Sequence, residues 1–236
     1  MRGLRFLLSV TLYTVWYGTK VVVAALAGVR QRAGGLYDQC QRRWARGLLR
    51  TNRISLRIEG IERLTPGRPV VFVSNHASFL DIWALLDGLP GTIRFVFKKE
   101  LLRVPIFGGA LRGMRHIQID RTNRSSAFAS YDEAAVSVRT GISAVVFAEG
   151  TRSRTGKLLP FKKGPFVLGI AAQVPIVPVF CADTFERLPK GSVSPKPGEI
   201  TLKLGEPIST EGLTYDARDQ LAARARREML ALGARE

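Results

Sequence analysis

Cysteine and histidine are both scarce in this 236-residue chain, which holds two of each. Cys40 and Cys181 lie far apart and belong to no Cys-x-x-Cys pattern, which speaks against a disulfide framework and a zinc site. Two histidines are too few for most catalytic metal sites. The chain also lacks a Gly-x-Ser-x-Gly segment, and no cysteine stands beside either histidine, which speaks against a serine or cysteine nucleophile. A reducing, cytosolic setting fits this composition best.

Acidic residues are few relative to basic ones. The chain has 19 Asp and Glu residues against 36 Lys and Arg, a formal net charge of +17. This excess indicates an anionic partner, which could be nucleic acid, anionic lipid headgroups or a phosphorylated substrate. More than half of it falls within residues 1–60, where eleven basic side chains accompany two acidic ones. No nucleic-acid motif and no interleaving of aromatic with basic residues is present, which disfavours a nucleic-acid partner.

The longest apolar run extends from Phe6 to Val29, with Lys20 as its only charge. A helix of this length could cross a bilayer, although Lys20 would be costly inside it, and a re-entrant or interfacial helix fits equally well. Basic residues flank the run on both sides, so the positive-inside rule leaves its orientation open. Two further alternatives are a cleaved signal peptide, with Ala25-Leu26-Ala27 as its cleavage site, and an ordinary buried core helix.

The segment that follows, Leu36 to Arg53, has helical periodicity. Leu36, Cys40, Trp44 and Leu48 share one helical face, and most of the arginines lie elsewhere, which predicts a basic interfacial helix. We therefore expect membrane-anchoring helices over residues 1–53 and one α/β domain over residues 54–236, long enough to bury a substantial core.

The remainder of the chain alternates short apolar segments with helical ones, which is typical of an α/β fold with a mixed, mainly parallel sheet flanked by helices. The predicted strands are Ser55–Glu59, Val70–Ser74, Arg94–Lys98, His116–Asp120, Ser143–Ala148, Ile176–Cys181 and Glu199–Gly205. The predicted helices are Phe79–Asp87, Pro105–Met114, Ser125–Thr140, Lys163–Gln173 and Tyr215–Leu232. Residues Pro189–Gly198 are rich in Pro, Gly, Ser and Lys and are predicted to form an exposed loop.

A histidine and a carboxylate follow the second predicted strand in the run Asn75-His76-Ala77-Ser78-Phe79-Leu80-Asp81. Side chains five residues apart on a helix point about 140° away from each other, so His76 must lie in the turn before the helix if it is to meet Asp81. Ser78 would then cap the helix, with Asp81 in its first turn. A histidine backed by a carboxylate is a candidate general base. The alternative is a purely structural capping box with His76 as a polar turn residue.

The segment Phe147–Gly156 also follows an apolar strand, FAEGTRSRTG. Gly150 permits a tight turn and close approach of a ligand, and the planar guanidinium of Arg152 suits bidentate phosphate binding. Thr151 could add a hydroxyl hydrogen bond. The alternative is a solvated polar loop. Lys98 and Lys99, at the end of the third predicted strand, could likewise bind an anion, although Lys99 and Glu100 could equally be ordinary surface charges.

Together, ordered blocks along residues 70–180 resemble the glycerolipid acyltransferases, in particular bacterial 1-acyl-sn-glycerol-3-phosphate acyltransferases. Asn75–Asp81 is similar to the NHxSxxD block of that family, Lys98–Gly108 to its KxEL…P..G segment, and Gly113–Arg121 to its second block. Phe147–Ser153 is similar to FPEGTRS and Val174–Val179 to VPIVPV. Ala148 replaces the usual proline, which affects the rigidity of the turn rather than any reacting group.

This resemblance implies transfer of an acyl chain from acyl-CoA or acyl-carrier protein to the sn-2 hydroxyl of 1-acyl-sn-glycerol 3-phosphate, giving phosphatidate. His76 would be the general base, oriented by Asp81, in a direct attack without an acyl-enzyme. Lys98, Arg152 and Arg121 would hold the phosphate, and Glu149 and Gly150 would shape the pocket around the glycerol. His116 is interpreted as structural.

The same resemblance implies no cofactor and no metal, since the acyl donor is a substrate, and a location at the cytoplasmic face of the cell inner membrane, among membrane phospholipids. Acylation of another lysolipid, such as an ornithine-type lipid or lysophospholipid, remains an alternative. A non-catalytic basic protein that binds membranes or nucleic acid is a further one.

Overall fold

The computed structural model describes residues 1–119 and 124–234 of the chain. Its centre is a seven-stranded sheet in the order β1-β7-β6-β2-β5-β3-β4, in which β6 and β7 are antiparallel and all other neighbours are parallel. The strands are β1 (Ile54–Glu59), β2 (Val71–Ser74), β3 (Ile93–Lys98), β4 (Ile117–Ile119), β5 (Ser143–Phe147), β6 (Ile176–Ala182) and β7 (Gly198–Leu204). The predicted α/β class and mainly parallel sheet are confirmed.

The helices cover both faces of this sheet. They are α1 (Arg2–Leu26), α2 (Leu36–Thr51), α3 (Leu80–Gly88), α4 (Phe107–Gly113), α5 (Arg124–Arg139), α6 (Gly164–Ala172), α7 (Thr184–Arg187) and α8 (Arg218–Ala234). Short 3₁₀ segments are η1 (Ile61–Arg63), η2 (Lys99–Arg103) and η3 (Tyr215–Ala217). The short helix α7 was not predicted, and the first turn of the predicted C-terminal helix is the separate segment η3.

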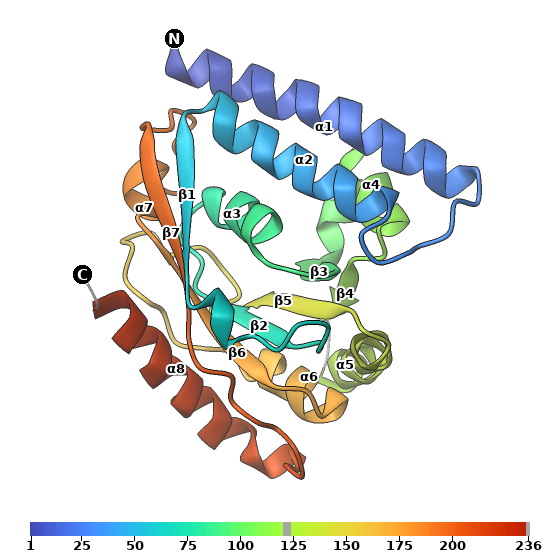
Figure 1. Ribbon diagram of the computed structural model, residues 1–236, viewed down its shortest axis with the longest axis vertical. Coiled ribbons are helices and arrows are strands. Elements are labelled where there is room, and N and C mark those ends of the chain that lie inside the picture. The colour runs from blue at the N-terminus through green and yellow to red at the C-terminus, as the bar shows by residue number, and fades with distance from the viewer. Residues whose placement is uncertain (120–123, 235–236) are drawn as a thin grey trace.

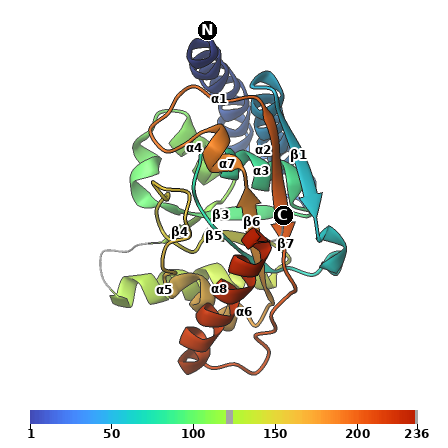
Figure 2. The same ribbon diagram turned by 90° about the vertical axis from the view of Figure 1, so that its left-hand side faces the viewer.

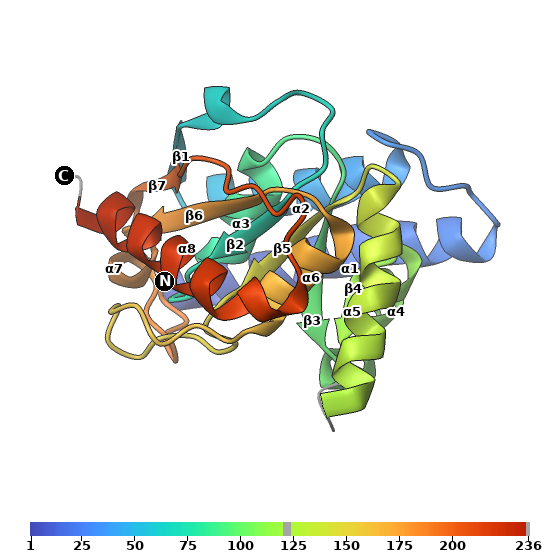
Figure 3. The same ribbon diagram turned by 90° about the horizontal axis from the view of Figure 1, so that it is seen from below.

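Two hydrophobic cores follow from the alternation of side chains along each strand. Phe72 of β2 packs with α2 and α3 on one face, whereas its neighbours Val71 and Val73 pack with α5, α6 and α8 on the other. Figure 1 shows α1, α2 and α3 on one side of the sheet, and Figure 3, seen from below, shows α5, α6 and α8 in front of the strands. Because both faces are covered, the central strands are apolar throughout rather than alternating with polar residues.

Helix α2 is part of the first core. Ala45, Leu48 and Leu49 are buried there. Two of its arginines are bound to the protein. Arg42 donates to the Leu86 and Gly91 carbonyls, and Arg46 pairs with Asp87 at 2.8 Å. The apolar stripe of residues 36–53 therefore packs inward on α3 and on α1, whereas a membrane-anchoring role for residues 1–53 stays a prediction.

Helix α1 lies lengthwise against α2 and α4 (Figure 1). Its inner side carries five buried residues, Phe6, Ser9, Gly18, Val21 and Ala24. Its outer side is apolar and exposed, with Leu4, Leu7, Leu8, Leu12, Val15, Trp16, Val23 and Leu26 all at least 45% exposed. Among the described residues it is the one helix long and apolar enough to cross a membrane. The exposed apolar face rules out the alternative of an ordinary buried core helix.

A buried ion pair connects the first two helices to the sheet. Arg94 of β3 donates to Asp38 of α2 at 2.7 Å, and both side chains are almost fully buried. Thr92 donates to the same carboxylate at 2.6 Å. Arg94 also donates to Gln31, whose amide donates to the Gly113 carbonyl at the end of α4. This network fixes the loop between α1 and α2 against the sheet.

Candidate active site

The residues predicted to carry the chemistry meet at one edge of the sheet. Strand β2 lies between β5 and β6, and His76 follows β2 just as Glu149 to Arg152 follow β5. Because these strands are parallel, their carboxyl ends open on the same side, which is where ligands bind in open α/β sheets. The segment after β5 and the helix α7 lie on the left in Figure 1 and face the viewer in Figure 2.

His76 and Asp81 form the expected pair. Nδ1 of His76 lies 2.8 Å from Oδ2 of Asp81, which is fully buried. The same oxygen accepts the backbone N–H groups of Ala77 and Ser78 at 2.7 and 2.8 Å. A carboxylate that accepts from Nδ1 fixes the proton there and leaves Nε2 free as a base.

The helix after this turn begins one residue later than predicted. Helix α3 starts at Leu80, with Phe79 rather than Ser78 at the N-cap position. The Ser78 hydroxyl still accepts from the Leu80 N–H at 3.1 Å. The structural alternative and the functional one therefore coexist, because Asp81 organises the turn and also binds the imidazole.

The backbone and ring of His76 are fixed from three sides. Its N–H donates to Oε1 of Glu149 at 2.7 Å, and its carbonyl accepts from the Ser153 N–H at 2.7 Å. Its ring stacks on Phe147, with 3.7 Å between ring centroids and 11° between planes. This arrangement holds the imidazole in one orientation without use of Nε2.

Asn75 fastens the same turn to the neighbouring strand. Its side-chain oxygen accepts from the Cys181 N–H at 2.7 Å, and its nitrogen donates to the Cys181 carbonyl at 3.2 Å. Asn75 is buried. The amide thus replaces a pair of strand hydrogen bonds where β2 ends.

Glu149 holds the backbone of His76 and the loop after β5 in place. Its second oxygen accepts from the Leu159 N–H at 2.8 Å, so each carboxylate oxygen already has a backbone partner. Burial raises the pKa of Glu149, and these two hydrogen bonds oppose that change. The side chain is 3% exposed and does not line the cavity described below. It shapes the site through the backbone of His76 and the loop after β5.

Basic side chains gather where the cavity meets this turn. Gly150, Thr151 and Arg152 line it from the loop after β5, and Lys98 lines it from the end of β3. The backbone of Gly150 has a φ of +71°, a conformation that favours glycine. The guanidinium of Arg152 lies 4.0 Å from the ring centroid of Phe79, and burial lowers its pKa while the charge of Asp81 raises it. Arg121 lies outside the described residues.

Lys190 is a basic residue at the cavity that sequence reasoning missed. It lines the cavity, and its Nζ donates to the Arg152 carbonyl at 3.3 Å. The segment Pro189–Gly198 was predicted only as an exposed loop. The available signal was that this loop follows β6, the strand beside β2. Composition alone does not show that the loop folds back over the turn that carries His76.

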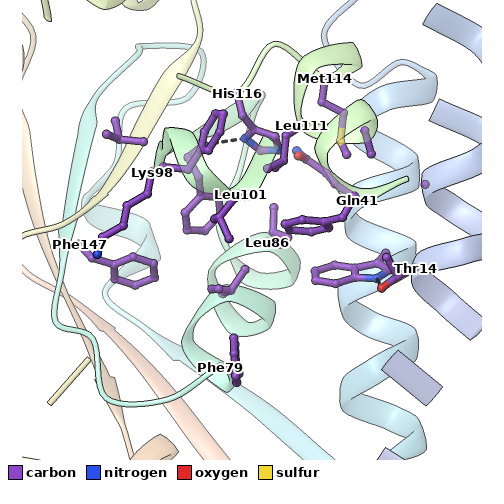
Figure 4. A pocket seen from close by; sticks show the side chains of 18 of the residues that line it. Thr14, Gln41, Phe79, Leu86, Lys98, Leu101, Leu111, Met114, His116 and Phe147 are labelled. Carbon is purple, nitrogen blue, oxygen red and sulfur yellow. Dashed lines mark hydrogen bonds between the residues drawn. The ribbon is translucent and has the colours of Figure 1, made fainter. Parts of the chain in front are cut away.

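The cavity has a volume of about 450 Å³ and is mostly apolar. Figure 4 shows Lys98, Phe147 and Phe79 on one side of it and Thr14, Gln41 and Met114 on the other. Residues of α1, α2, α4 and β3 form most of its wall; they include Thr14, Tyr17, Gly18, Val21, Cys40, Gln41, Trp44, Phe95, Val96, Phe97, Ala110 and Leu111. An apolar chain would bury its surface here, with its polar end at His76 and the basic residues.

His116 also lines the cavity but has different surroundings. Its Nδ1 accepts the Phe95 N–H at 2.9 Å (Figure 4). Burial, and to a smaller extent the charge of Arg94, lowers the pKa of His116 to about 3. A neutral imidazole that accepts a strand N–H fits the structural role predicted for His116.

Comparison with known proteins gives one consistent family. The family model described as Acyltransferase matches residues 55–182. The chain is 34% identical over 207 residues to a 1-acyl-sn-glycerol-3-phosphate acyltransferase of Cocos nucifera, covering 87% of this chain and 66% of that protein. It is 36% identical over 178 residues to the human 1-acyl-sn-glycerol-3-phosphate acyltransferase alpha, covering 75% of this chain and 63% of that protein. The chain thus spans slightly less than two thirds of these relatives.

A solved structure is similar over nearly the whole chain. The crystal structure of the 1-acyl-sn-glycerophosphate (LPA) acyltransferase PlsC from Thermotoga maritima matches with a TM-score of 0.80 and 28% sequence identity. The match covers 99% of this chain and 95% of that one. The similarity therefore extends to the N-terminal helices as well as the sheet.

Proposed function

We propose that this chain, which belongs to the acyltransferase family, transfers an acyl chain from acyl-CoA or acyl-carrier protein to the sn-2 hydroxyl of 1-acyl-sn-glycerol 3-phosphate. The product would be phosphatidate. The names of the similar proteins support this acceptor. The observation that carries the proposal is the His76–Asp81 pair, which lies where an apolar cavity meets a group of basic side chains.

His76 is the general base in this mechanism. Nε2 takes the proton of the acceptor hydroxyl as the hydroxyl oxygen attacks the thioester carbonyl carbon. The carbon–sulfur bond then breaks, and the thiolate leaves with the proton returned from Nε2. Asp81 holds the imidazole and stabilises its positive charge during the step. No covalent intermediate on the protein is required.

The basic residues bind the phosphate of the acceptor. Arg152 and Lys98 supply charge, and Thr151 supplies a hydroxyl. Gly150 lets the backbone approach the glycerol, and Glu149 holds the turn that carries His76. The role of Arg121 stays a prediction. No carboxylate among the described residues lies within salt-bridge distance of Arg152 or Lys98, so both charges are available to an anion.

We further propose that α1 anchors the protein in the interface of the inner membrane at its cytoplasmic face. The helix lies lengthwise on α2 and α4, so crossing the bilayer would require it to leave this packing. Gly18 allows close contact, since a Cβ there would lie 2.7 Å from Ile106. The exposed leucines on the outer side of α1 suit burial at the level of the headgroups and upper acyl chains. The division into an anchoring part, residues 1–53, and a catalytic part, residues 54–236, stays a prediction.

An acceptor panel tests the function. Purified protein in neutral detergent is given labelled acyl-CoA, or acyl-carrier protein, with lysophosphatidate, lysophosphatidylglycerol, a lyso-ornithine lipid or glycerol 3-phosphate. We expect phosphatidate to form fastest, and the same protein with His76→Ala provides the blank.

Two results would contradict the proposal in different ways. Preference for the lyso-ornithine lipid or a lysophospholipid would retain acyl transfer and replace the acceptor. Absence of transfer to every acceptor, together with salt-sensitive binding to DNA that is tighter than binding to anionic vesicles, would replace catalysis by a binding role.

A further inference from the structure

Lys190 belongs to the connection between α7 and β7, residues 188–197, which follows β6 at the edge of the sheet that holds His76. This connection is fixed at its start. The carbonyl of Leu188, a residue that is 1% exposed, accepts from the Ser78 hydroxyl at 2.7 Å. Lys190 therefore stands two residues from a direct bond to the turn of the candidate base.

The far end of the connection is fixed as well. The Lys196 N–H donates to the Arg187 carbonyl at 2.8 Å, and the Ser192 N–H donates to the Pro189 carbonyl at 3.0 Å. These bonds close a compact loop around Lys190. The backbone that presents Lys190 is thus held by hydrogen bonds on both sides of it.

The side chain of Lys190 points to the loop after β5. Its ammonium donates to the Arg152 carbonyl at 3.3 Å and, with Arg152 and Thr151, lines the cavity. An ammonium has three donors, and one of them is used here. Its other two donors make no bond within the described residues, and Arg152, whose guanidinium lies over the Phe79 ring, lines the same cavity.

The charges at this position are not balanced by carboxylates. Within the described part of the chain, neither Lys190 nor Arg152 has an acidic side chain within salt-bridge distance. Asp81 is bound to His76 and two backbone amides, and Glu149 is bound to two more. Two positive charges that line one cavity without carboxylate partners match a dianion better than a monoanion.

We infer that Lys190 and Arg152 form one subsite for a phosphate monoester, and that Lys190 is the residue that distinguishes such an acceptor from a phosphodiester lysolipid. A monoester carries a second negative charge near neutral pH and three free oxygens, whereas a diester carries one charge. Arg152 would bind two oxygens with its planar fork, and Lys190 would bind the third. This inference rests on the proposed function for the identity of the acceptor.

Equilibrium binding tests the inference without reliance on turnover. Labelled lysophosphatidate and labelled lysophosphatidylglycerol are bound to the full chain in neutral detergent micelles, for the unchanged protein and for Lys190→Met, Lys190→Gln and Lys190→Arg. Lys196→Met is the matched control, because Lys196 is an exposed lysine of the same connection that does not line the cavity.

We expect Lys190→Met and Lys190→Gln to weaken the binding of lysophosphatidate by about tenfold and that of lysophosphatidylglycerol by about twofold or less, as loss of one charge-assisted hydrogen bond implies. Lys190→Arg should restore most of the difference, and Lys196→Met should bind as the unchanged protein does. In steady-state assays, the KM for lysophosphatidate should rise by a larger factor than kcat falls.

Equal losses for the two lipids, unchanged binding in both neutral variants, or an increase confined to the KM for acyl-CoA would overturn the inference. Failure of the proposed function has a different signature. The protein would then bind lysophosphatidate through Lys190 but acylate another acceptor, or it would bind neither lipid, in which case both ideas fail.

Discussion

The two histidines of this chain line the same cavity in two contrasting regions. His76 stands at the basic end, with a buried carboxylate on Nδ1 and a free Nε2. His116 stands on the β4 side, where its Nδ1 accepts a backbone N–H and the nearest influential charge is that of Arg94. A row of aromatic rings joins the two histidines. The centroid distances between successive rings are 3.7 Å for His76 and Phe147, 5.7 Å for Phe147 and Phe95, and 6.2 Å for Phe95 and His116.

This difference shows how partners decide what a histidine does. A carboxylate on one nitrogen stabilises the imidazolium that a general base must become. Burial and, to a smaller extent, the charge of Arg94 oppose protonation of His116 and lower its pKa to about 3. Substitution of His76 is therefore expected to change mainly the reaction rate, and substitution of His116 mainly the stability of the fold.

The largest expected effect is on catalysis, from His76→Ala. Removal of the base should lower kcat by on the order of 10⁴-fold, at the upper end of what general-base catalysis provides. The melting temperature should change little, because the backbone of His76 keeps its bonds to Glu149 and Ser153. Initial rates with the preferred acceptor measure the loss.

His116→Gln is the matched control for the other region, since its amide oxygen can accept the Phe95 N–H. It should retain activity within about tenfold. If His116→Gln were as inactive as His76→Ala, the contrast between the two histidines would be broken.

Asp81→Ala is expected to lower kcat by on the order of 10³-fold and also to destabilise the protein by about 1 to 3 kcal/mol. The second effect arises because the Ala77 and Ser78 N–H groups lose their acceptor. Ser78→Ala separates the two roles, since Ser78 contacts Leu80 and Leu188 but not the imidazole. It should lower stability with a much smaller loss of kcat, as paired denaturation and rate measurements would show. Equal losses of kcat in the two variants would mean that Asp81 acts only through the turn.

Arg94→Met should destabilise the protein by about 3 to 5 kcal/mol, because it leaves the buried carboxylate of Asp38 without its ion-pair partner. Arg46→Met is the control. The Arg46–Asp87 pair is half exposed, and its loss should cost about 1 kcal/mol or less. Urea denaturation of both variants measures the difference. A small effect of Arg94→Met would mean that the first two helices do not depend on this link to the sheet.

The sequence predicted the strands well because each is a short apolar run bounded by Gly, Pro or polar residues. It also predicted the contact between His76 and Asp81, since only a turn position allows two side chains five residues apart to meet. These successes have a common cause. The interactions involved are local, and local spacing determines them.

What the sequence did not reveal depends on distant partners. Asp38 and Arg94 are 56 residues apart, and neither lies in a pattern that indicates a buried pair. The arginines of α2 suggested that its apolar stripe faces a membrane surface, whereas the stripe packs on α3 and α1, and Arg42 and Arg46 bind groups near α3. Lys190 was missed because the fold-back of its loop depends on the Ser78–Leu188 bond, which joins residues 110 apart.

The smallest expected effect is the pH dependence of stability that His116 contributes. The pKa of His116 is about 3 in the folded protein and about 6.5 when the chain is unfolded. Below pH 6.5 the unfolded chain binds a proton that the folded chain does not, so stability falls as the pH falls from about 6.5 towards 3.

For His116 alone the slope approaches about 1.4 kcal/mol per pH unit. His116→Gln removes this contribution, so the difference in free energy of unfolding between it and the unchanged protein should narrow or reverse between pH 7 and pH 5. Parallel stability curves over that range would show that His116 is protonated as readily in the folded protein as in the unfolded chain. Burial would then not oppose protonation of His116, and the contrast between the two histidines would rest on the Asp81 carboxylate alone.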